Sequence, residues 1–266
     1  MRPNRMMERL RAGELLLGVC NTYSSSGIIE GMCAGWDFVW IDGQHGEHDQ
    51  RSTLNAIVAA RSVGVASLVR VAGHAPHVLG GAADQDPSAL LIPMVNSRDE
   101  ARAVVAAVRF PPLGQRSYGG RRAVDLNGRD YHVERELGVV LQIETPEAVD
   151  CVDQIVSVEG VDGVFFGPDD MRVRLSLAMD TPVTADERLR AAFERTAVAA
   201  RNAGKFAAVP VAGPEAASVA MSLGYRMLVG GSDIGFLRAA GARLAELREI
   251  IEQSDGTASS DDVRPI

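Results

Sequence analysis

Four short apolar runs in this chain each lead to a side chain that can take part in acid–base chemistry, metal binding or charge stabilisation. The runs are Phe38–Asp42 with His45 just beyond it, Leu68–Arg70, Val139–Glu144 and Val164–Asp170. Paired carboxylates suit a hard divalent cation, an imidazole beside a carboxylate suits general base catalysis, and a guanidinium suits an anionic oxygen. Brought together, these groups would form one site with a metal ion, a base and a fixed positive charge.

Glu144 and Asp170 are the candidate metal ligands. They follow two consecutive predicted strands, and neighbouring strands lie about 5 Å apart, so the two carboxylates can reach a common point. With no His or Cys nearby, this pair suits Mg²⁺ or Mn²⁺, and Co²⁺ is also compatible, with water or substrate oxygens completing the coordination. Two other interpretations stay open: a general acid–base pair, and solvated or helix-capping carboxylates, since Asp169 and Asp170 follow Gly-Pro.

His45 is the candidate base. Asp42, three residues before it, can hold the tautomer of the ring, and Asp84, which leads into the fourth predicted strand, is a further candidate for this role. An exposed loop histidine is the alternative interpretation of His45. Arg70 ends a strand, where a permanent cation is costly unless an anion meets it. That anion is either Asp42 or a substrate oxygen on which charge develops.

The elements that must position these groups are eight apolar runs that alternate with helical patterns. An apolar run without polar alternation is typical of a strand that is covered on both faces. We place the strands near residues 14–20, 37–42, 66–71, 89–93, 137–143, 162–166, 205–210 and 226–230. Eight such units predict an α/β protein built as a (β/α)8 TIM barrel, in which the carboxyl ends of all strands meet at one catalytic rim.

One domain accounts for the whole chain. We assign the barrel to residues 1–253 and a polar, flexible tail to residues 254–266. Helical patterns cover residues 97–109, 184–202 and 234–253, and Thr184 with Glu187 forms a capping-box pattern at the start of the second. The long irregular stretch Pro111–Asn127 is expected to be a functional loop, because loops of this length are otherwise uncommon in compact domains.

Composition and charge narrow the class of protein. The formal net charge of −8 with scattered arginines argues against nucleic acid as a partner, because such binding needs clustered positive charge. Three cysteines, Cys20, Cys33 and Cys151, without a C-x-x-C pattern predict neither a disulfide framework nor a thiolate zinc site, and favour the cytoplasm. No apolar run reaches the roughly 20 residues that span a bilayer, so we expect no membrane insertion.

In this order and register, the motifs resemble those of the HpcH/HpaI family of class II, metal-dependent pyruvate aldolases. The matching segments are Phe38–Gly46, Val69–Val71, Leu91–Val95, Arg109–Arg116, Gln142–Thr145 and Gly160–Asp170. The resemblance runs over about residues 14–245. It implies reversible retro-aldol cleavage of 4-hydroxy-2-oxo acids, of the 2-keto-3-deoxy acid type, to pyruvate and an aldehyde. It further implies a metal-stabilised enolate, no organic cofactor, and a hexamer with the C-terminal helix swapped between subunits.

The resemblance also implies roles for individual residues. The catalytic set is His45, Asp84, Arg70 and Asp42, the substrate-binding set is Arg70, Gln142, Asp169 and Asp170, and the metal ligands are Glu144 and Asp170. Within these sets His45 would be the base with Asp84 as its acid partner, and Arg70 would stabilise the enolate oxygen. The backbone amides of Asp169 and Asp170 would receive the pyruvate carboxylate. A Schiff-base mechanism is disfavoured, because Lys205 opens the seventh predicted strand at the opposite end of the barrel.

The chain departs from the family pattern around the mouth of the predicted barrel. Gln44 replaces the usual Glu before the base, Met171–Arg174 replaces a Leu-Ser segment, and Asp84–Ser88 replaces a Gly-rich turn. Ser117 stands where Gly is typical. An acidic aldehyde could be recruited by the nearby arginines, although solvated surface residues are the favoured interpretation of Arg116, Arg172 and Arg174. Two alternatives to the aldolase remain: a malyl- or citramalyl-CoA-type lyase, and a catalytically silent metabolite-binding barrel.

Overall fold

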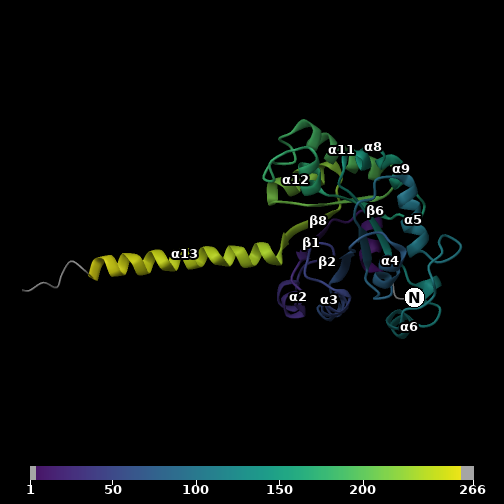
Figure 1. Cartoon of the computed structure of the whole chain (residues 1–266), viewed down its shortest axis with the longest axis horizontal. Helices are drawn as coiled ribbons and strands as arrows, with labels where there is room; N and C mark the ends of the chain where they lie inside the picture. The colour runs from purple at the N-terminus through teal and green to yellow at the C-terminus, as the bar shows by residue number, and fades with distance from the viewer. Residues whose placement is uncertain (1–3, 259–266) are drawn as a thin grey trace, which may run out of the picture.

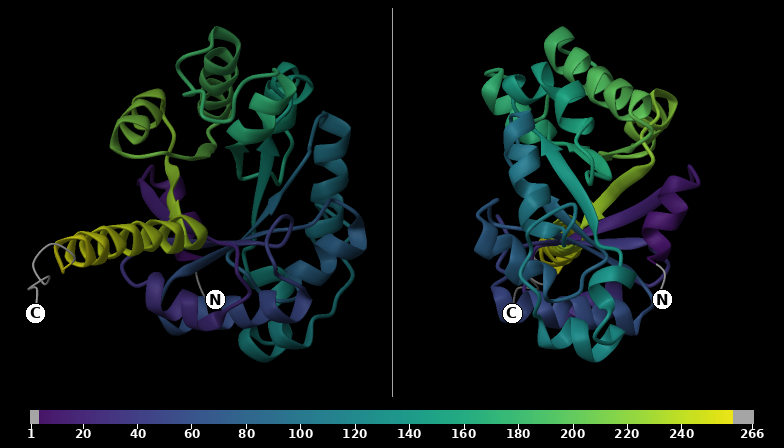
Figure 2. Two further views of the ribbon diagram at one scale, coloured as in Figure 1. Left: turned by 60° about the vertical axis from the view of Figure 1, so that its left-hand side comes forward. Right: turned by 90° about the vertical axis from the view of Figure 1, so that its right-hand side faces the viewer.

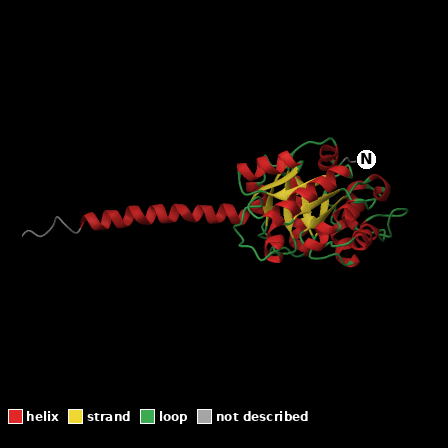
Figure 3. Ribbon diagram, turned by 90° about the horizontal axis from the view of Figure 1, so that it is seen from above, coloured by secondary structure: helices red, strands yellow, loops and turns green. Residues whose placement is uncertain are grey.

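A computed structural model describes residues 4–258 of the chain, and in it eight parallel strands close into one barrel. The strands are β1 (Leu16–Asn21), β2 (Phe38–Asp42), β3 (Ala66–Arg70), β4 (Ala89–Ile92), β5 (Gly138–Ile143), β6 (Gly163–Phe166), β7 (Phe206–Pro210) and β8 (Met227–Ser232). They pair in sequence order, and β1 closes the ring against β8. The predicted (β/α)8 fold is confirmed, and helices surround the strands (Figures 2 and 3).

All helices except the first and the last lie in the connections between strands, on the outside of the barrel (Figure 1). The helices are α1 (Arg5–Arg11), α2 (Ser26–Met32), α3 (Gln50–Ser62), α4 (Pro76–Ala83), α5 (Arg98–Val108), α6 (Arg121–Asn127), α7 (Tyr131–Glu134), α8 (Pro146–Asp150), α9 (Val152–Val156), α10 (Pro168–Arg174), α11 (Glu187–Asn202), α12 (Pro214–Leu223) and α13 (Asp233–Ala258). None of the helices within residues 4–258 combines the length and apolarity needed to cross a bilayer.

Three predicted boundaries differ from the structure. The stretch expected to be irregular contains α6, which occupies its last seven residues. Helix α11 begins at Glu187 and is capped by Asp186, whose carboxylate accepts hydrogen bonds from two amides of the first turn, so Thr184 is not its cap. Helix α13 continues to Ala258, five residues into the expected tail, and residues 259–266 lie outside the described part of the chain.

The apolar residues form two separate cores. The larger core lies between the strands and the surrounding helices. The smaller one fills the barrel interior, where it includes Trp40 and Phe165 in an edge contact with ring centroids 5.2 Å apart. Helix α1 contributes Met6, Met7 and Leu10 to the inner core. Packing inside the barrel therefore leaves the two rims as the places where polar groups can gather.

Helix α13 leaves the barrel instead of folding back onto it (Figure 1). Its exposed apolar side chains include Leu237, Leu244, Leu247 and Ile251, which recur at spacings of seven, three and four residues along one face. On the barrel, the outward-facing Leu17 of β1 is also exposed. A barrel strand normally has a helix over its outer face, so this region lacks part of its cover within one chain.

Candidate active site

Asp42 and Arg70 form a buried ion pair at the carboxyl ends of two adjacent strands. The register pairs these residues across β2 and β3, so both side chains leave the sheet at one level. Arg70 donates from Nε to Asp42 Oδ1 at 2.8 Å and from Nη2 to Asp42 Oδ2 at 2.6 Å. Its guanidinium lies 4.6 Å from the centroid of the Trp40 ring. Asp42 is thus the anion that neutralises Arg70, and Nη1 is not used by the pair.

The loop after β2 wraps around the Asp42 carboxylate. Backbone N–H groups of Gln44 and His45 donate to Asp42 Oδ1 at 3.0 and 3.2 Å. Burial alone would raise the pKa of Asp42, but the hydrogen bonds and charge of Arg70 and the two amides outweigh it, so the pKa lies below its ordinary value. Gly46 is required for this close wrap, because a Cβ there would overlap the carbonyl oxygen of Asp42. The His45 ring remains exposed at the rim.

Glu144 follows β5 and is almost fully buried. Its Oε1 accepts from the backbone N–H of Met94 at 2.7 Å, and its Oε2 accepts from Gln142 Nε2 at 2.5 Å. Met94 has φ +57°, a left-handed conformation that is unusual for a residue with a side chain and turns its amide toward the carboxylate. Gly167 leaves room beside Glu144, since a Cβ there would lie 2.7 Å from Glu144 Cβ.

Asp170 lies close to Glu144, in the first turn of α10 after β6. Burial raises the pKa of Glu144 to about 7, and the neighbouring Asp170 carboxylate adds to this effect while the Met94 amide opposes it. The buried Glu144 and the half-buried Asp170 repel each other when both are ionised, and a cation between them would remove this cost. Gln142 Oε1 beside them is buried and has no hydrogen-bond partner in the described structure.

A divalent metal ion therefore fits the donor set at this point. Glu144 and Asp170 offer hard oxygen ligands of the kind that Mg²⁺ and Mn²⁺ prefer. Within residues 4–258, no group of three or more His, Cys, Asp and Glu side chains gathers as a metal cluster. Glu144 and Asp170 would contribute two carboxylates to such an ion, and the other coordination positions would fall to water or substrate oxygens.

The substrate-binding candidates at the start of α10 differ in orientation. The Asp169 side chain is 74% exposed, and its carboxylate pairs with Arg172 Nη1 at 2.6 Å. The backbone amides of Asp169 and Asp170 belong to the first turn of the helix, where N–H groups lack partners within the helix. Any contribution of Asp169 to substrate binding therefore comes from its main chain.

Asp84 pairs with Arg116, and within residues 4–258 it contacts none of the other residues proposed for catalysis or metal binding. It caps the carboxyl end of α4, which runs back from the catalytic rim, and leads into the start of β4. Its Oδ1 accepts from Arg116 Nη2 at 2.7 Å. The structure does not bring Asp84 to His45 within one chain, because barrel helices run antiparallel to the strands and end at the opposite rim.

Two of the three arginines interpreted as solvated have side chains that are largely shielded from solvent. The Arg116 side chain is 6% exposed and stacks 4.8 Å from the centroid of Phe110. The Arg172 side chain is 12% exposed and also donates to the carbonyl of Thr181 at 2.8 Å. The interpretation was therefore wrong for Arg116 and Arg172. Asp84, the partner of Arg116, follows α4, whereas Asp169, the partner of Arg172, lies one turn earlier in the same helix. Arg174 is exposed as expected.

Sequence reasoning missed a polar chain at the ends of β1 and β8. The buried His48 contacts Asn21 through Nε2 and Oδ1 at 2.9 Å, and Asn21 Nδ2 donates to Asp233 Oδ2 at 2.9 Å. Burial lowers the pKa of His48, which favours a neutral ring. The rule used for the other strands, that polar residues at strand ends face the site, would have found Asn21 and Asp233. His48 lies within a loop, where burial has no sequence signal.

Comparisons with known proteins point to one family. The family described as HpcH/HpaI aldolase/citrate lyase matches residues 24–240. A 4-hydroxy-2-oxo-heptane-1,7-dioate aldolase of Shigella sonnei is 33% identical, over 91% of this chain and 94% of the relative. A Burkholderia cenocepacia protein of the HpcH/HpaI aldolase/citrate lyase family has a solved structure that superposes with a TM-score of 0.84 at 29% identity, covering 92% of this chain and all of that one.

Proposed function

The chain belongs to the HpcH/HpaI aldolase/citrate lyase family, and from this premise we propose that it is a metal-dependent carbon–carbon lyase. Its reaction is the reversible retro-aldol cleavage of 4-hydroxy-2-oxo acids to pyruvate and an aldehyde. The observation that carries this proposal is the close approach of the buried Glu144 and the half-buried Asp170, on the same rim as the Asp42–Arg70 ion pair. Together they supply oxygen ligands for a cation beside a fixed positive charge.

Glu144 and Asp170 are the residues that would hold the metal ion, Mg²⁺ or Mn²⁺, with Co²⁺ also compatible. When bound, a divalent cation supplies a Lewis acid that lowers the energy of the enolate. Gln142 orients the Glu144 carboxylate through its side-chain amide, and its unpartnered carbonyl oxygen remains for a substrate or water donor. The free amides at the start of α10 suit the pyruvate carboxylate.

Arg70 acts on the charge that develops during cleavage. Breaking the C3–C4 bond leaves its electron pair on the pyruvate fragment as an enolate, while C4 becomes the aldehyde carbon. Arg70 Nη1, which the Asp42 pair does not use, can donate to the enolate oxygen. A buried, pre-oriented cation is effective here because it needs no rearrangement when the charge appears. Asp42 therefore serves as the positioning residue for Arg70.

We assign the proton transfer to His45. Its ring would accept the proton of the 4-hydroxyl group during cleavage and return it during addition. The contact of its backbone amide with Asp42 anchors the loop that carries the ring at the rim. Because Asp84 lies at the opposite end of its own barrel, a His45–Asp84 dyad would require Asp84 from a second protomer.

The projecting α13 supports such an assembly. Its exposed apolar face and the uncovered Leu17 of β1 are complementary, and a helix exchanged between copies would bury both. We propose a homo-oligomer with α13 swapped between subunits, a hexamer by family resemblance. The three unpaired cysteines suit the reducing environment of the cytoplasm, where we place the protein.

The test is the exchange of pyruvate methyl protons in D₂O, followed by NMR, because enolisation needs no aldehyde. EDTA-treated protein should be inactive, and restored Mg²⁺ or Mn²⁺ should produce exchange. Glu144→Gln should abolish the exchange, whereas Glu147→Gln, an exposed neighbour in α8, should leave it unchanged. Metal-independent exchange, or full exchange in Glu144→Gln, would contradict the proposal. No exchange with any metal would favour the thioester lyase or the silent binding barrel.

A further inference from the structure

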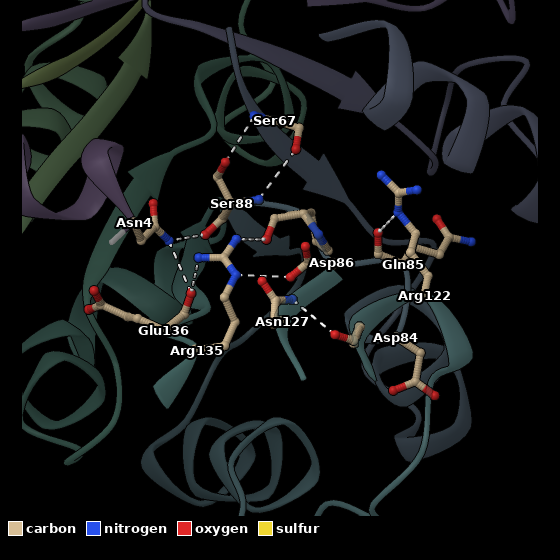
Figure 4. A network of polar contacts seen from close by, with 12 residues as sticks. Asn4, Ser67, Asp84, Gln85, Asp86, Ser88, Arg122, Asn127, Arg135 and Glu136 are labelled. Atoms are coloured by element: carbon tan, nitrogen blue, oxygen red, sulfur yellow. Dashed lines mark hydrogen bonds and ion pairs between the residues drawn. The ribbon is translucent and has the colours of Figure 1, made fainter. Parts of the chain in front are cut away.

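A cavity of about 280 Å³ lies at the amino-terminal end of the barrel, opposite the catalytic rim. Its walls come from α1, the end of α3, the starts of β3 and β4, and α6. Figure 4 shows the polar network beside it, with the guanidinium of Arg135 between Asp86 and Glu136. The aldolase reaction proposed above uses none of these groups.

Asp86 is the centre of this network and has an unusual backbone. Its φ is +58°, in the left-handed region that favours glycine, although Asp and Asn also adopt it. The side chain is 4% exposed, and its carboxylate accepts from Arg135 Nε at 2.9 Å and from Arg61 Nη2 at 2.7 Å. One buried carboxylate therefore meets two guanidinium groups.

Positive charge exceeds negative charge around the cavity. Three guanidinium groups, those of Arg5, Arg61 and Arg135, and the single carboxylate of Asp86 line it, which leaves two positive charges. Arg122 lies nearby, and burial together with the charge of Arg61 lowers its pKa. The carboxylate of Asp86 opposes this shift without cancelling it.

The cavity also offers hydrogen-bond donors that have no acceptor. The backbone N–H of Ser67 donates to Ser88 Oγ at 3.2 Å, and that of Ser88 donates to Ser67 Oγ at 3.3 Å. Both hydroxyl oxygens thus act as acceptors, and among the described residues nothing accepts their protons. Arg61 uses only Nη2 in its contacts with Asp86, and its side chain is 41% exposed, so solvent reaches the site.

We propose that this cavity is a binding site for a small dianion, a phosphate or phosphate monoester or a dicarboxylate. Two excess positive charges match a dianion, and the forked guanidinium of Arg61 with the hydroxyl groups of Ser67 and Ser88 matches its oxygens. The volume exceeds that of one inorganic oxyanion, so a small organic dianion also fits. The site is independent of the proposed aldolase activity, because it lies at the other end of the barrel.

The test is calorimetric titration of the EDTA-treated full chain with inorganic phosphate at pH 8, and separately with succinate, at constant ionic strength set with chloride. Arg61→Met and Arg5→Met should each weaken binding about tenfold or more, because each removes a charged donor. Arg5 makes no contact with Asp86, so its variant keeps the network. Arg102→Met, an exposed arginine on α5, is the matched control and should bind as the wild type does.

Asp86→Asn separates a ligand site from a purely structural ion pair. Asn tolerates the left-handed backbone and removes the competing negative charge, so the variant should bind the dianion more tightly than the wild type. Added dianion should also raise its melting temperature more than that of the wild type. Binding of phosphate alone or succinate alone would identify the ligand class. Absence of binding by both, or equal affinity in Arg61→Met, Arg5→Met and the wild type, would overturn the proposal.

Discussion

Two buried carboxyl groups of the catalytic rim have opposite electrostatic surroundings. Asp42 faces the Arg70 guanidinium and two amides, so its ionised form is favoured. Burial and then the neighbouring Asp170 raise the pKa of Glu144 to about 7, so its protonated form persists. One carboxylate is therefore suited to hold a cationic side chain, and the other to receive a metal ion. Each arrangement gives a measurable consequence.

In metal-free protein, ionisation of Glu144 should reduce stability as the pH rises. The folded state holds the proton up to about pH 7, whereas an ordinary Glu loses it near 4.5. The free energy of unfolding should thus fall by on the order of 3 kcal/mol between pH 4.5 and about pH 7, and it should stay constant at higher pH. Urea unfolding with EDTA at pH 5 and pH 8 measures this, with Glu144→Gln as the reference that lacks the group. If the unfolding free energy of the wild type changed between pH 5 and pH 8 by the same amount as that of Glu144→Gln, the pKa of Glu144 would not be raised in the folded protein.

The Asp42–Arg70 pair should be costly to break from one side. Asp42→Asn leaves the buried Arg70 without a counter-charge, and such changes cost about 3 to 5 kcal/mol of unfolding free energy. Urea unfolding at pH 7.5 measures the loss. The exposed pair Arg195–Asp153 provides the control, because Asp153→Asn should change stability by less than about 1 kcal/mol. Equal losses of unfolding free energy in the two variants would contradict the claim that burial makes the Asp42–Arg70 pair more costly to break than an exposed pair.

At the level of elements, the turn from β6 into α10 must pass close to Glu144. Gly167→Ala places a Cβ 2.7 Å from Glu144 Cβ and 3.0 Å from Gln142 Nε2, so it should push the carboxylate away from Asp170. We expect metal affinity to fall at least about tenfold, as for changes that misorient ligands. Gly80→Ala in α4 meets no atom within 4 Å and should leave affinity unchanged. Calorimetric titration with Mn²⁺ measures the affinity of each variant. An unchanged affinity in Gly167→Ala would show that a Cβ at this position does not displace the Glu144 carboxylate.

The strands could be predicted because burial on both faces leaves a plain mark in the sequence. Every observed strand lies within two residues of its predicted bounds, as β5 at Gly138–Ile143 does. The rim residues Asp42, Arg70 and Glu144 followed, since the fold carries each strand end to one place. Residues outside strand ends were less predictable. Asp84 was a candidate from its place before the fourth strand and from the family resemblance, but the direction of α4 places it at the other rim.

Burial of long polar side chains was the other feature that sequence did not reveal. Arg116 is shielded from solvent and pairs with Asp84, which lies 32 residues away in the sequence. The buried His48 and the left-handed Asp86 similarly depend on neighbours distant in sequence. Such pairings are properties of the assembled barrel, and no local pattern encodes them.

At the scale of the whole molecule, α13 should control assembly. Leu244→Asp places a charge on its apolar face, so the variant should have a lower mass than the wild type by light scattering coupled to gel filtration. Glu249→Gln on the same helix is the control, and its mass should not change. A wild-type mass equal to that of one chain, or an unaltered oligomer in Leu244→Asp, would refute the swapped assembly.

The pairing of β1 with β8 has a consequence for synthesis on the ribosome. Leu16 N–H donates to the Arg226 carbonyl at 2.8 Å, so the first strand made completes its hydrogen bonds only with the last. About 200 residues separate the two, and translation at roughly 5 to 20 residues per second keeps the nascent edge of β1 unpaired for roughly 10 to 40 s. During that interval its apolar residues and unpaired amides are available to a chaperone, and a pause placed before the codons of β8 would prolong the exposure.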